Sequence, residues 1–246
     1  MSAPQADPGT SSALPVGVIG GVGPLATAYF MDKVVRLTRA ERDQDHVDMV
    51  VLNHATIPDR TAFILGDSDQ DPGPVMARDA ERLEAFGVSF IVVPCNTAHF
   101  FTRRIVAAVQ VPVLSIVAET VAEARSRLTD LTAVGVLATT GTVHARVYQD
   151  ELERSGLTCL VPDEDDQAVM MEIIYDQVKA GRPVDMGAFA GVVHRLRSRG
   201  AQLVVLGCTE LSVIAEDEDL IADPTYVDSL DVLVRRTIAR AGHEVR

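Results

Sequence analysis

The stretch "VGVIGGVGPLATAYFMDKV" (residues 16–34) can be laid without a gap on "VGVLATTGTVHARVYQDEL" (residues 134–152), 118 positions further along the chain. The match pairs Gly17 with Gly135, Gly23 with Gly141, Phe30 with Tyr148 and Asp32 with Asp150, among others. Self-similarity of this kind marks a duplicated structural unit. Each copy begins with an apolar β-type run, turns at glycine and continues with a helical pattern.

A second pair of stretches belongs to the same duplication. "FIVVPCNTAHFF" (residues 90–101) and "LVVLGCTELSVI" (residues 203–214) both run apolar into a cysteine and then turn polar, and Cys95 and Cys208 lie 113 positions apart. The small change of offset corresponds to a short deletion between the repeats. Each half therefore contains a strand that ends in cysteine.

Along the rest of the chain, predicted strands and helices also alternate, which is typical of parallel-sheet α/β folds. Buried strands are predicted at residues 15–21, 47–55, 89–95, 111–117, 132–140, 157–162 and 202–208, and helices at 25–41, 74–87, 143–156, 167–181, 186–200 and around 227–242. We expect two similar α/β lobes with parallel sheets, related by pseudo-twofold symmetry around a central cleft. The predicted division is a flexible tail at 1–14, a first lobe of 15–117 plus 213–246, and a second lobe of 118–212.

Composition narrows the function classes. The chain has 246 residues, a formal net charge of −13 at pH 7 and a pI near 4.8, so a nucleic-acid partner is not expected, because phosphate binding depends on clustered Lys and Arg. No apolar run is long enough for a membrane span and no signal peptide is present, which predicts a cytoplasmic protein. The three cysteines are expected as thiols, and the scattered histidines give no metal-ligand spacing.

Placement at strand ends gives the two repeated cysteines a chemical use. Ligands of open α/β sheets bind at the carboxyl ends of strands, so Cys95 and Cys208 would enter one cleft from opposite sides. A thiolate on one face of a carbon and a thiol on the other can racemise it. Helix N-termini after both cysteines would favour the thiolate or bind a substrate carboxylate. The plainer interpretation, a small buried hydrophobic residue, applies to either cysteine alone and to Cys159.

Several blocks, in order, resemble one known family. "GGVGPLAT", "NHATIPDRTAFILG", "PCNTAHFF", "LATTGTV", "VMMEIIYDQVKAG" and "GCTEL" are similar to the cofactor-independent Asp/Glu racemase superfamily, most of all to its aspartate racemases, over about residues 15–240. Glutamate racemases have "GCTH" at the second cysteine, where this chain has Glu210. Arylmalonate decarboxylases, relatives with one catalytic cysteine, are disfavoured by the presence of both.

The resemblance implies a role for each matched residue. Cys95 and Cys208 would be the catalytic acid and base, with Cys95 serving the D-enantiomer and Cys208 the L-enantiomer. Arg60 and Lys179 would hold the side-chain carboxylate of the substrate. The remaining substrate-binding residues would be Asn53, Asn96, Thr97, Thr139, Thr142 and Thr209. No cofactor and no metal would be needed, the partner would be a small amino acid, and the protein would be a homodimer.

Alternative functions remain open at this stage. "GVGPLA" satisfies the dinucleotide pattern G-x-G-x-x-A, but the next strand ends in Asn53 and not in the acidic residue that such sites place on the ribose. A hydrolase could use Cys95 with His99 as its base, although no third group to orient that base is evident. His144 follows the other turn and is a weaker candidate. A broad-specificity amino-acid racemase and a noncatalytic amino-acid binding protein are the other hypotheses.

Overall fold

The computed structural model describes residues 14–246, so the predicted tail, apart from the exposed Leu14, lies outside the described residues. The first repeat contains β1 (Val16–Gly20), α1 (Pro24–Leu37), η1 (Asp43–Asp45), β2 (Met49–Asn53), α2 (Arg60–Leu65), α3 (Gly73–Phe86), β3 (Ile91–Val92), η2 (Thr97–Phe101), α4 (Thr102–Ala108), β4 (Val113–Leu114) and α5 (Ile116–Arg127). The second contains β5 (Ala133–Leu137), α6 (Thr140–His144), α7 (Val147–Arg154), β6 (Thr158–Leu160), α8 (Glu164–Met171), the π-helical segment η3 (Glu172–Val178), α9 (Met186–Ser198), β7 (Leu203–Leu206), α10 (Thr209–Asp217), η4 (Leu220–Ala222), β8 (Tyr226–Asp228) and α11 (Ser229–Arg240).

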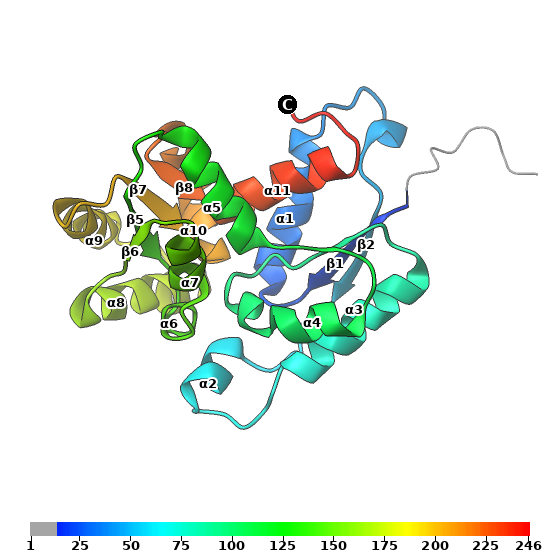
Figure 1. Cartoon of the computed structure of the whole chain (residues 1–246), viewed down its shortest axis with the longest axis horizontal. Coiled ribbons are helices and arrows are strands. Elements are labelled where there is room, and N and C mark those ends of the chain that lie inside the picture. Colours follow the sequence, from blue (N-terminus) through cyan, green and yellow to red (C-terminus); the bar gives the residue numbers. More distant parts are fainter. Residues whose placement is uncertain (1–13) are drawn as a thin grey trace, which may run out of the picture.

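The described residues form two four-stranded parallel sheets with the same strand order. The first sheet runs β2-β1-β3-β4 and the second β6-β5-β7-β8. In each, the strand that opens the repeat lies inside the sheet, next to the strand that leads to the cysteine. The predicted fold class, two similar α/β lobes, is confirmed (Figure 1).

The last helix of each repeat packs on the other lobe. Helix α5 ends the first repeat and contacts α7, β7 and β8 of the second, whereas α11 ends the second repeat and packs against α1 of the first. The two helices also pack on each other in the centre of the molecule (Figure 1). Phe30 and Tyr148, paired in the sequence repeat, are fully buried in this central core together with Val234 of α11.

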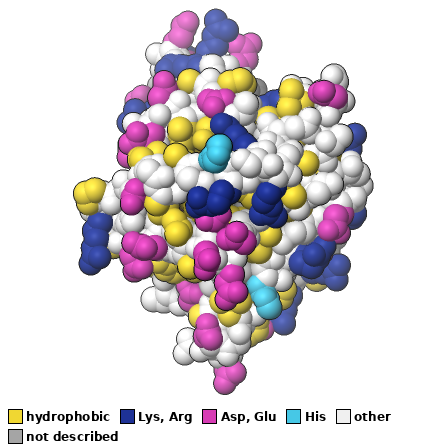
Figure 2. Space-filling view, turned by 90° about the vertical axis from the view of Figure 1, so that its left-hand side faces the viewer, with side chains coloured by type: hydrophobic (Ala, Val, Ile, Leu, Met, Phe, Trp, Pro, Cys, Tyr) yellow, Lys and Arg dark blue, Asp and Glu magenta, His cyan; other side chains and the backbone are white. Residues whose placement is uncertain are grey.

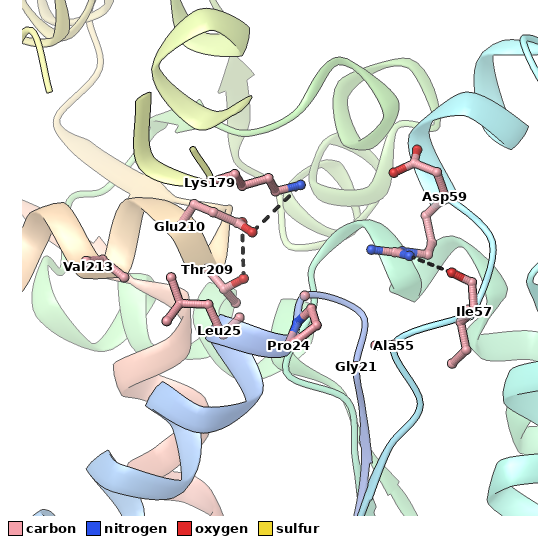
Figure 3. A pocket seen from close by; sticks show the side chains of 13 residues that line it. Gly21, Pro24, Leu25, Ala55, Ile57, Asp59, Lys179, Thr209, Glu210 and Val213 are labelled. Atoms are coloured by element: carbon pink, nitrogen blue, oxygen red, sulfur yellow. Dashed lines mark hydrogen bonds and ion pairs between the residues drawn. The ribbon is translucent and has the colours of Figure 1, made fainter. Parts of the chain in front are cut away.

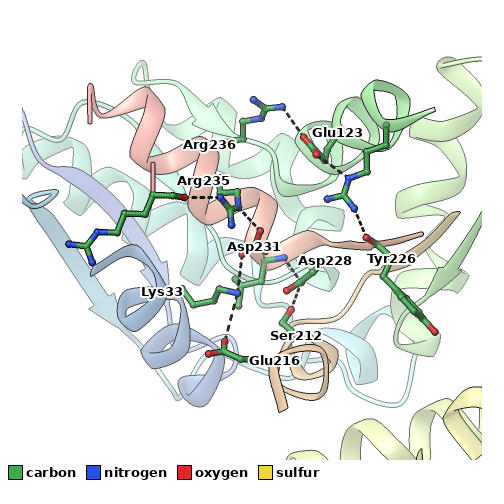
Figure 4. A network of polar contacts seen from close by, with 12 residues as sticks. Lys33, Glu123, Ser212, Glu216, Tyr226, Asp228, Asp231, Arg235 and Arg236 are labelled. Atoms are coloured by element: carbon green, nitrogen blue, oxygen red, sulfur yellow. Dashed lines mark hydrogen bonds and ion pairs between the residues drawn. The ribbon is translucent and has the colours of Figure 1, made fainter. Parts of the chain in front are cut away.

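A buried ion pair fixes α11 on the first lobe. Lys33 of α1 is only 5% exposed, and its Nζ lies 3.0 Å from Asp231 Oδ1 of α11 and 3.8 Å from Glu216 Oε2 of α10 (Figure 4). The C-terminus continues this contact, because Arg246 N donates to Leu37 O at 2.8 Å. A buried cation needs such partners to offset its lost hydration.

Strand pairing places one boundary differently from the sequence prediction. Residues 213–246 were assigned to the first lobe, but β8 pairs with β7 and extends the second sheet. The chain passes to the first lobe only after Asp228, where α11 begins. We propose lobe limits of 15–115 with 229–246, and 116–228.

Several predicted elements are shorter or of another kind than the pattern indicated: strand 89–95 is a strand only at Ile91–Val92, and helix 143–156 is divided between α6 and α7. The stretch 111–117 is a strand only at Val113–Leu114, because Ser115 caps α5 by accepting a hydrogen bond from Ala118 N at 3.2 Å. The predicted helix 167–181 changes from α-helical to π-helical at Glu172. Such wide turns occur frequently at functional sites.

The surface carries charges of both signs. Acidic and basic side chains are interspersed over the face shown in Figure 2, which includes the second lobe. None of the helices within residues 14–246 combines the length and apolar character needed to cross a membrane.

Candidate active site

Cys95 and Cys208 line one cavity between the two lobes. It is narrow, with a volume of about 20 Å³ for the centres of water-sized molecules, which is room for about one water. Both cysteines follow the carboxyl ends of equivalent strands, β3 and β7, and both are buried, with 7% and 5% exposure. The wall of the cavity is completed by Val22, Asp59, Arg60, Thr61, Asn96, Thr97, Thr139, Tyr175, Lys179, Thr209 and Glu210.

A wider outer cavity of about 370 Å³ leads to this inner one. The two cavities share Asp59, Arg60, Lys179, Thr209 and Glu210, which therefore surround the passage between them. In Figure 3, Lys179, Glu210 and Thr209 form one side of the outer cavity, and Asp59 and Ile57 form the other, with Pro24 and Leu25 at its floor.

The Cys95 turn is held by backbone contacts and by His99. Cys95 N donates to Val93 O at 2.8 Å. Ile116 N donates to His99 Nε2 at 3.2 Å, so the ring proton is on Nδ1, which donates to Cys95 O at 2.9 Å. Burial lowers the pKa of His99 to about 4, which keeps the ring neutral.

This geometry argues against the Cys95–His99 hydrolase. The imidazole uses both nitrogens on backbone groups, one at Cys95 O and one at the start of α5. A general base would need to face the Cys95 sulfur. His99 therefore shapes the turn and fixes its position against α5.

The Cys208 turn is different, because a carboxylate contacts the sulfur. Cys208 is the N-cap of α10, and its Sγ donates to Glu210 Oε2 at 3.0 Å. Burial and the negative charge of Glu210 raise the pKa of Cys208 well above its ordinary value, and Lys179 offsets part of this effect. Cys159 lies on β6, outside this cavity, where burial raises its pKa to about 12.

Three of the predicted threonines meet in a triangle of hydroxyl groups. Thr97 Oγ1 lies 3.0 Å from Thr139 Oγ1 and 2.9 Å from Thr142 Oγ1, and the last two are 3.0 Å apart. Thr97 belongs to the first repeat and the other two to the second. The contact joins the lobes beside the cavity, where Thr97 and Thr139 form part of the wall.

Asn96 is also at the cavity, but its side-chain amide is occupied. Its Nδ2 donates to Ser229 Oγ at 3.0 Å, and its Oδ1 accepts from Tyr148 OH at 2.6 Å. These partners come from α11 and α7, so Asn96 links both lobes.

The two predicted cations lie at the passage, one from each repeat. Arg60 Nη1 donates to the carbonyls of Ile57 and Pro58 at 3.4 and 3.1 Å, and its buried Nε has no partner among the described residues. Lys179 Nζ lies 3.7 Å from Glu210 Oε1 and 3.8 Å from the ring centre of Tyr175. Burial acts to lower the pKa of Lys179, but Glu210 and Tyr175 raise it above its ordinary value, so the side chain is charged.

Two predicted residues line neither cavity, and others were missed. Thr142 is buried and bonds to Thr97 and Thr139, and Asn53 is exposed at the end of β2. Glu210, Asp59 and Tyr175 line the inner cavity without having been included in the predicted site. Of these three residues, only Glu210 could have been predicted from its position in the sequence, because it lies in the first turn of the helix that starts at Cys208. Within residues 14–246, no group of three or more His, Cys, Asp or Glu side chains is arranged to hold a metal ion.

Fold and site together define an α/β protein of two similar lobes that contribute one buried thiol each to a common cavity. The model of one family, described as Asp/Glu/hydantoin racemase, matches residues 19–237. The chain belongs to this family.

Individual relatives agree with the family. The chain is 28% identical over 230 residues to the broad specificity amino-acid racemase RacX of Bacillus subtilis, covering 91% of this chain and 96% of the relative. A glutamate racemase of Deinococcus radiodurans is 30% identical over 251 residues, covering 96% of this chain and 77% of that protein. Among solved structures, the aspartate racemase of Picrophilus torridus superimposes with a TM-score of 0.79 at 27% identity, covering 94% of this chain and 96% of the other.

Proposed function

We propose that the protein is a cofactor-independent amino-acid racemase that interconverts L- and D-aspartate. The observation that carries the proposal is the cavity itself, into which equivalent positions of a sequence repeat bring Cys95 and Cys208. Family membership and the similarity to the aspartate racemase of Picrophilus torridus support it.

The reaction needs one proton to leave the α-carbon and another to arrive on the opposite face. The thiolate of Cys95 takes the α-proton of one enantiomer and becomes a thiol, while the electron pair of the broken C–H bond remains on the substrate. The thiol of Cys208 then gives its proton to the other face and becomes a thiolate. The opposite direction uses the same two groups in exchanged roles.

The cations at the passage support a dicarboxylate substrate. Arg60 has an unpartnered buried Nε, and a guanidinium can bind a carboxylate through two parallel hydrogen bonds. Lys179 and the hydroxyls of Thr97, Thr139 and Thr209 lie along the same wall. We propose that Arg60 and Lys179 bind the side-chain carboxylate and that the threonines surround the α-carboxylate and amino group.

A racemase with broad specificity is the second candidate. It is favoured by the similarity to the broad specificity racemase of Bacillus subtilis and by the pairing of Lys179 with Glu210, which leaves less positive charge for a second carboxylate. The same two-thiol chemistry applies to both candidates, and they differ only in how the side chain of the substrate is held.

The test is incubation of the purified protein with L-aspartate in deuterated water without added cofactor. Racemisation predicts D-aspartate together with deuterium at the α-carbon. A noncatalytic binding protein produces neither, and a hydrolase releases other products. Parallel incubation with L-glutamate, L-alanine and L-lysine separates an aspartate racemase from a broad-specificity one.

A further inference from the structure

The two thiols do not have equivalent surroundings. Cys208 Sγ donates to the carboxylate of Glu210 at 3.0 Å, and the other oxygen of this carboxylate faces Lys179 Nζ at 3.7 Å. The side chain of Glu210 is only 12% exposed. At Cys95, the described hydrogen bonds are those of the backbone N–H and C=O groups.

An ionised carboxylate is only an acceptor, so its bond to Cys208 requires that the sulfur carries the proton. Removing that proton would leave two negative charges about 3 Å apart in a buried place. The raised pKa of Cys208 agrees with this geometry.

We propose that Glu210 is a positioning residue that keeps Cys208 in the thiol form, so that the resting enzyme holds its catalytic proton on Cys208 and begins its cycle with Cys95 as the base. This inference rests on the proposed racemase function. It gives the two directions of the reaction different starting states, since the enantiomer that needs Cys208 as a base must wait until the proton has moved to Cys95.

Other charged or titratable groups face Cys208 from several elements. Besides Glu210 on its own helix, these are Tyr175 from η3, Lys179 directly after η3, Asp59 and Arg60 from the start of α2, Cys95 from the turn after β3, and Tyr148 from α7. Of the two cations, Lys179 is the one that pairs with the carboxylate of Glu210 and so offsets its negative charge.

The experiment measures ionisation of Cys208 and not turnover. In the full-length chain carrying Cys95→Ser and Cys159→Ser, Cys208 is the remaining cysteine, and its titration can be followed by the ultraviolet absorbance of the thiolate. Adding Glu210→Gln should lower the titration midpoint by about 1 pH unit or more. Asp217→Asn is the matched control, because it removes one exposed carboxylate from the same helix, and it should shift the midpoint by less than about 0.3 units.

A second variant changes the midpoint in the opposite direction. Lys179→Met removes the positive charge beside Glu210 and should raise the midpoint. The proposal is overturned if Glu210→Gln leaves the midpoint unchanged or raises it, or if Asp217→Asn lowers it equally. Should Glu210→Gln fail to fold by circular dichroism, an unchanged midpoint in Lys179→Met overturns the proposal instead. Because no substrate is needed, a protein without racemase activity would refute the function and still give this readout.

Discussion

Four residues after each of the two cysteines in the cavity, a side chain bonds to the start of a helix. That helix ends the same repeat and packs on the other lobe. After Cys95 this residue is His99, which accepts from Ile116 N of α5. After Cys208 it is Ser212, whose hydroxyl donates at 2.5 Å to Asp228, the N-cap of α11. The two repeats keep the same connection and make it with different chemistry.

The paired glycines show the same divergence. Gly23 has φ +101° and caps α1, so its backbone requires glycine. Its partner Gly141 lies inside α6, where an added Cβ would come within 2.9 Å of Thr61 Cα in α2. The first glycine serves a turn and the second a close approach between lobes. Duplication has therefore preserved the framework while the local reason for each residue has changed.

The largest effect should come from removing either thiol. Cys95→Ala and Cys208→Ala should each reduce racemisation of aspartate by about 10²–10⁴-fold, because each direction needs both an acid and a base. Cys159→Ala, outside the cavity, is the control and should stay close to the parent rate. Chiral chromatography of the product measures all three. Near-normal racemisation by Cys95→Ala or by Cys208→Ala would show that the reaction does not need both cysteines.

Arg60 tests whether the cation from the first repeat selects the substrate. Arg60→Ala should reduce kcat/KM for aspartate by more than about tenfold and for alanine much less, because loss of a buried charged partner typically costs about 2–5 kcal/mol. Arg60→Lys keeps the charge without the planar fork and should lie between the two. Equal losses on both substrates would mean that Arg60 supports the fold of α2 and not substrate binding.

Gly141→Ala tests the contact between lobes. The added methyl group should displace α2 and the adjacent Arg60, raising KM for aspartate about tenfold and costing roughly 1–3 kcal/mol of stability. Gly87→Ala is the control, because Gly87 has φ +93° with open space around it, so the change costs backbone strain alone. Both are measured by steady-state kinetics and thermal unfolding. A raised KM in Gly87→Ala as well would assign the effect to general destabilisation.

The smallest predicted effect is on the pH dependence of stability. It arises from His99 and Asp228, which belong to the two connections that follow the cysteines. Burial lowers the pKa of His99 to about 4 in the folded protein, against about 6.5 when unfolded, so its contribution to stability is complete above pH 6.5 and is lost as pH falls toward 4. Burial raises the pKa of Asp228 to about 6, so its contribution is present below the unfolded value of about 3.9 and is lost as pH rises through 6.

These two contributions to stability change in opposite directions with pH. The contribution of His99 is therefore measured as the difference in stability between the parent and a His99→Gln variant. Between about pH 7 and pH 5, the parent should lose on the order of 1–2 kcal/mol relative to His99→Gln. Denaturant unfolding of both proteins at the two pH values gives this number. Parallel pH dependence in the two proteins would show that His99 takes up no proton on unfolding in this range.

Sequence patterns predicted the fold well because the duplication aligned long, strongly periodic segments. They failed where a tertiary contact overrides local pattern. Residues 227 and 228 were included in the predicted helix around 227–242, yet they belong to β8, which pairs with β7, and Asp228 supplies the cap from which α11 starts. Likewise, Ser115 ends a run of apolar residues that looked like one strand.

The site was predictable where chemistry is tied to strand ends. Cys95 and Cys208 could be placed in one cavity from the sequence because ligands of parallel sheets bind at the carboxyl ends of the strands. The bond from Cys208 to Glu210 was not, since it depends on a side-chain rotamer in the first turn of a helix. Asn53 also ends a strand, but β2 is at the edge of its sheet and leaves that side chain exposed, away from the cleft.

The exchange of α5 and α11 has an evolutionary consequence. Two separate one-repeat chains that traded their last helices would form a symmetric dimer of this shape. In such a dimer both cysteine-containing turns have the same sequence, so every mutation alters both of them at once. Joining the copies into one chain removes that constraint, and a carboxylate can then be acquired beside one sulfur without being imposed on the other.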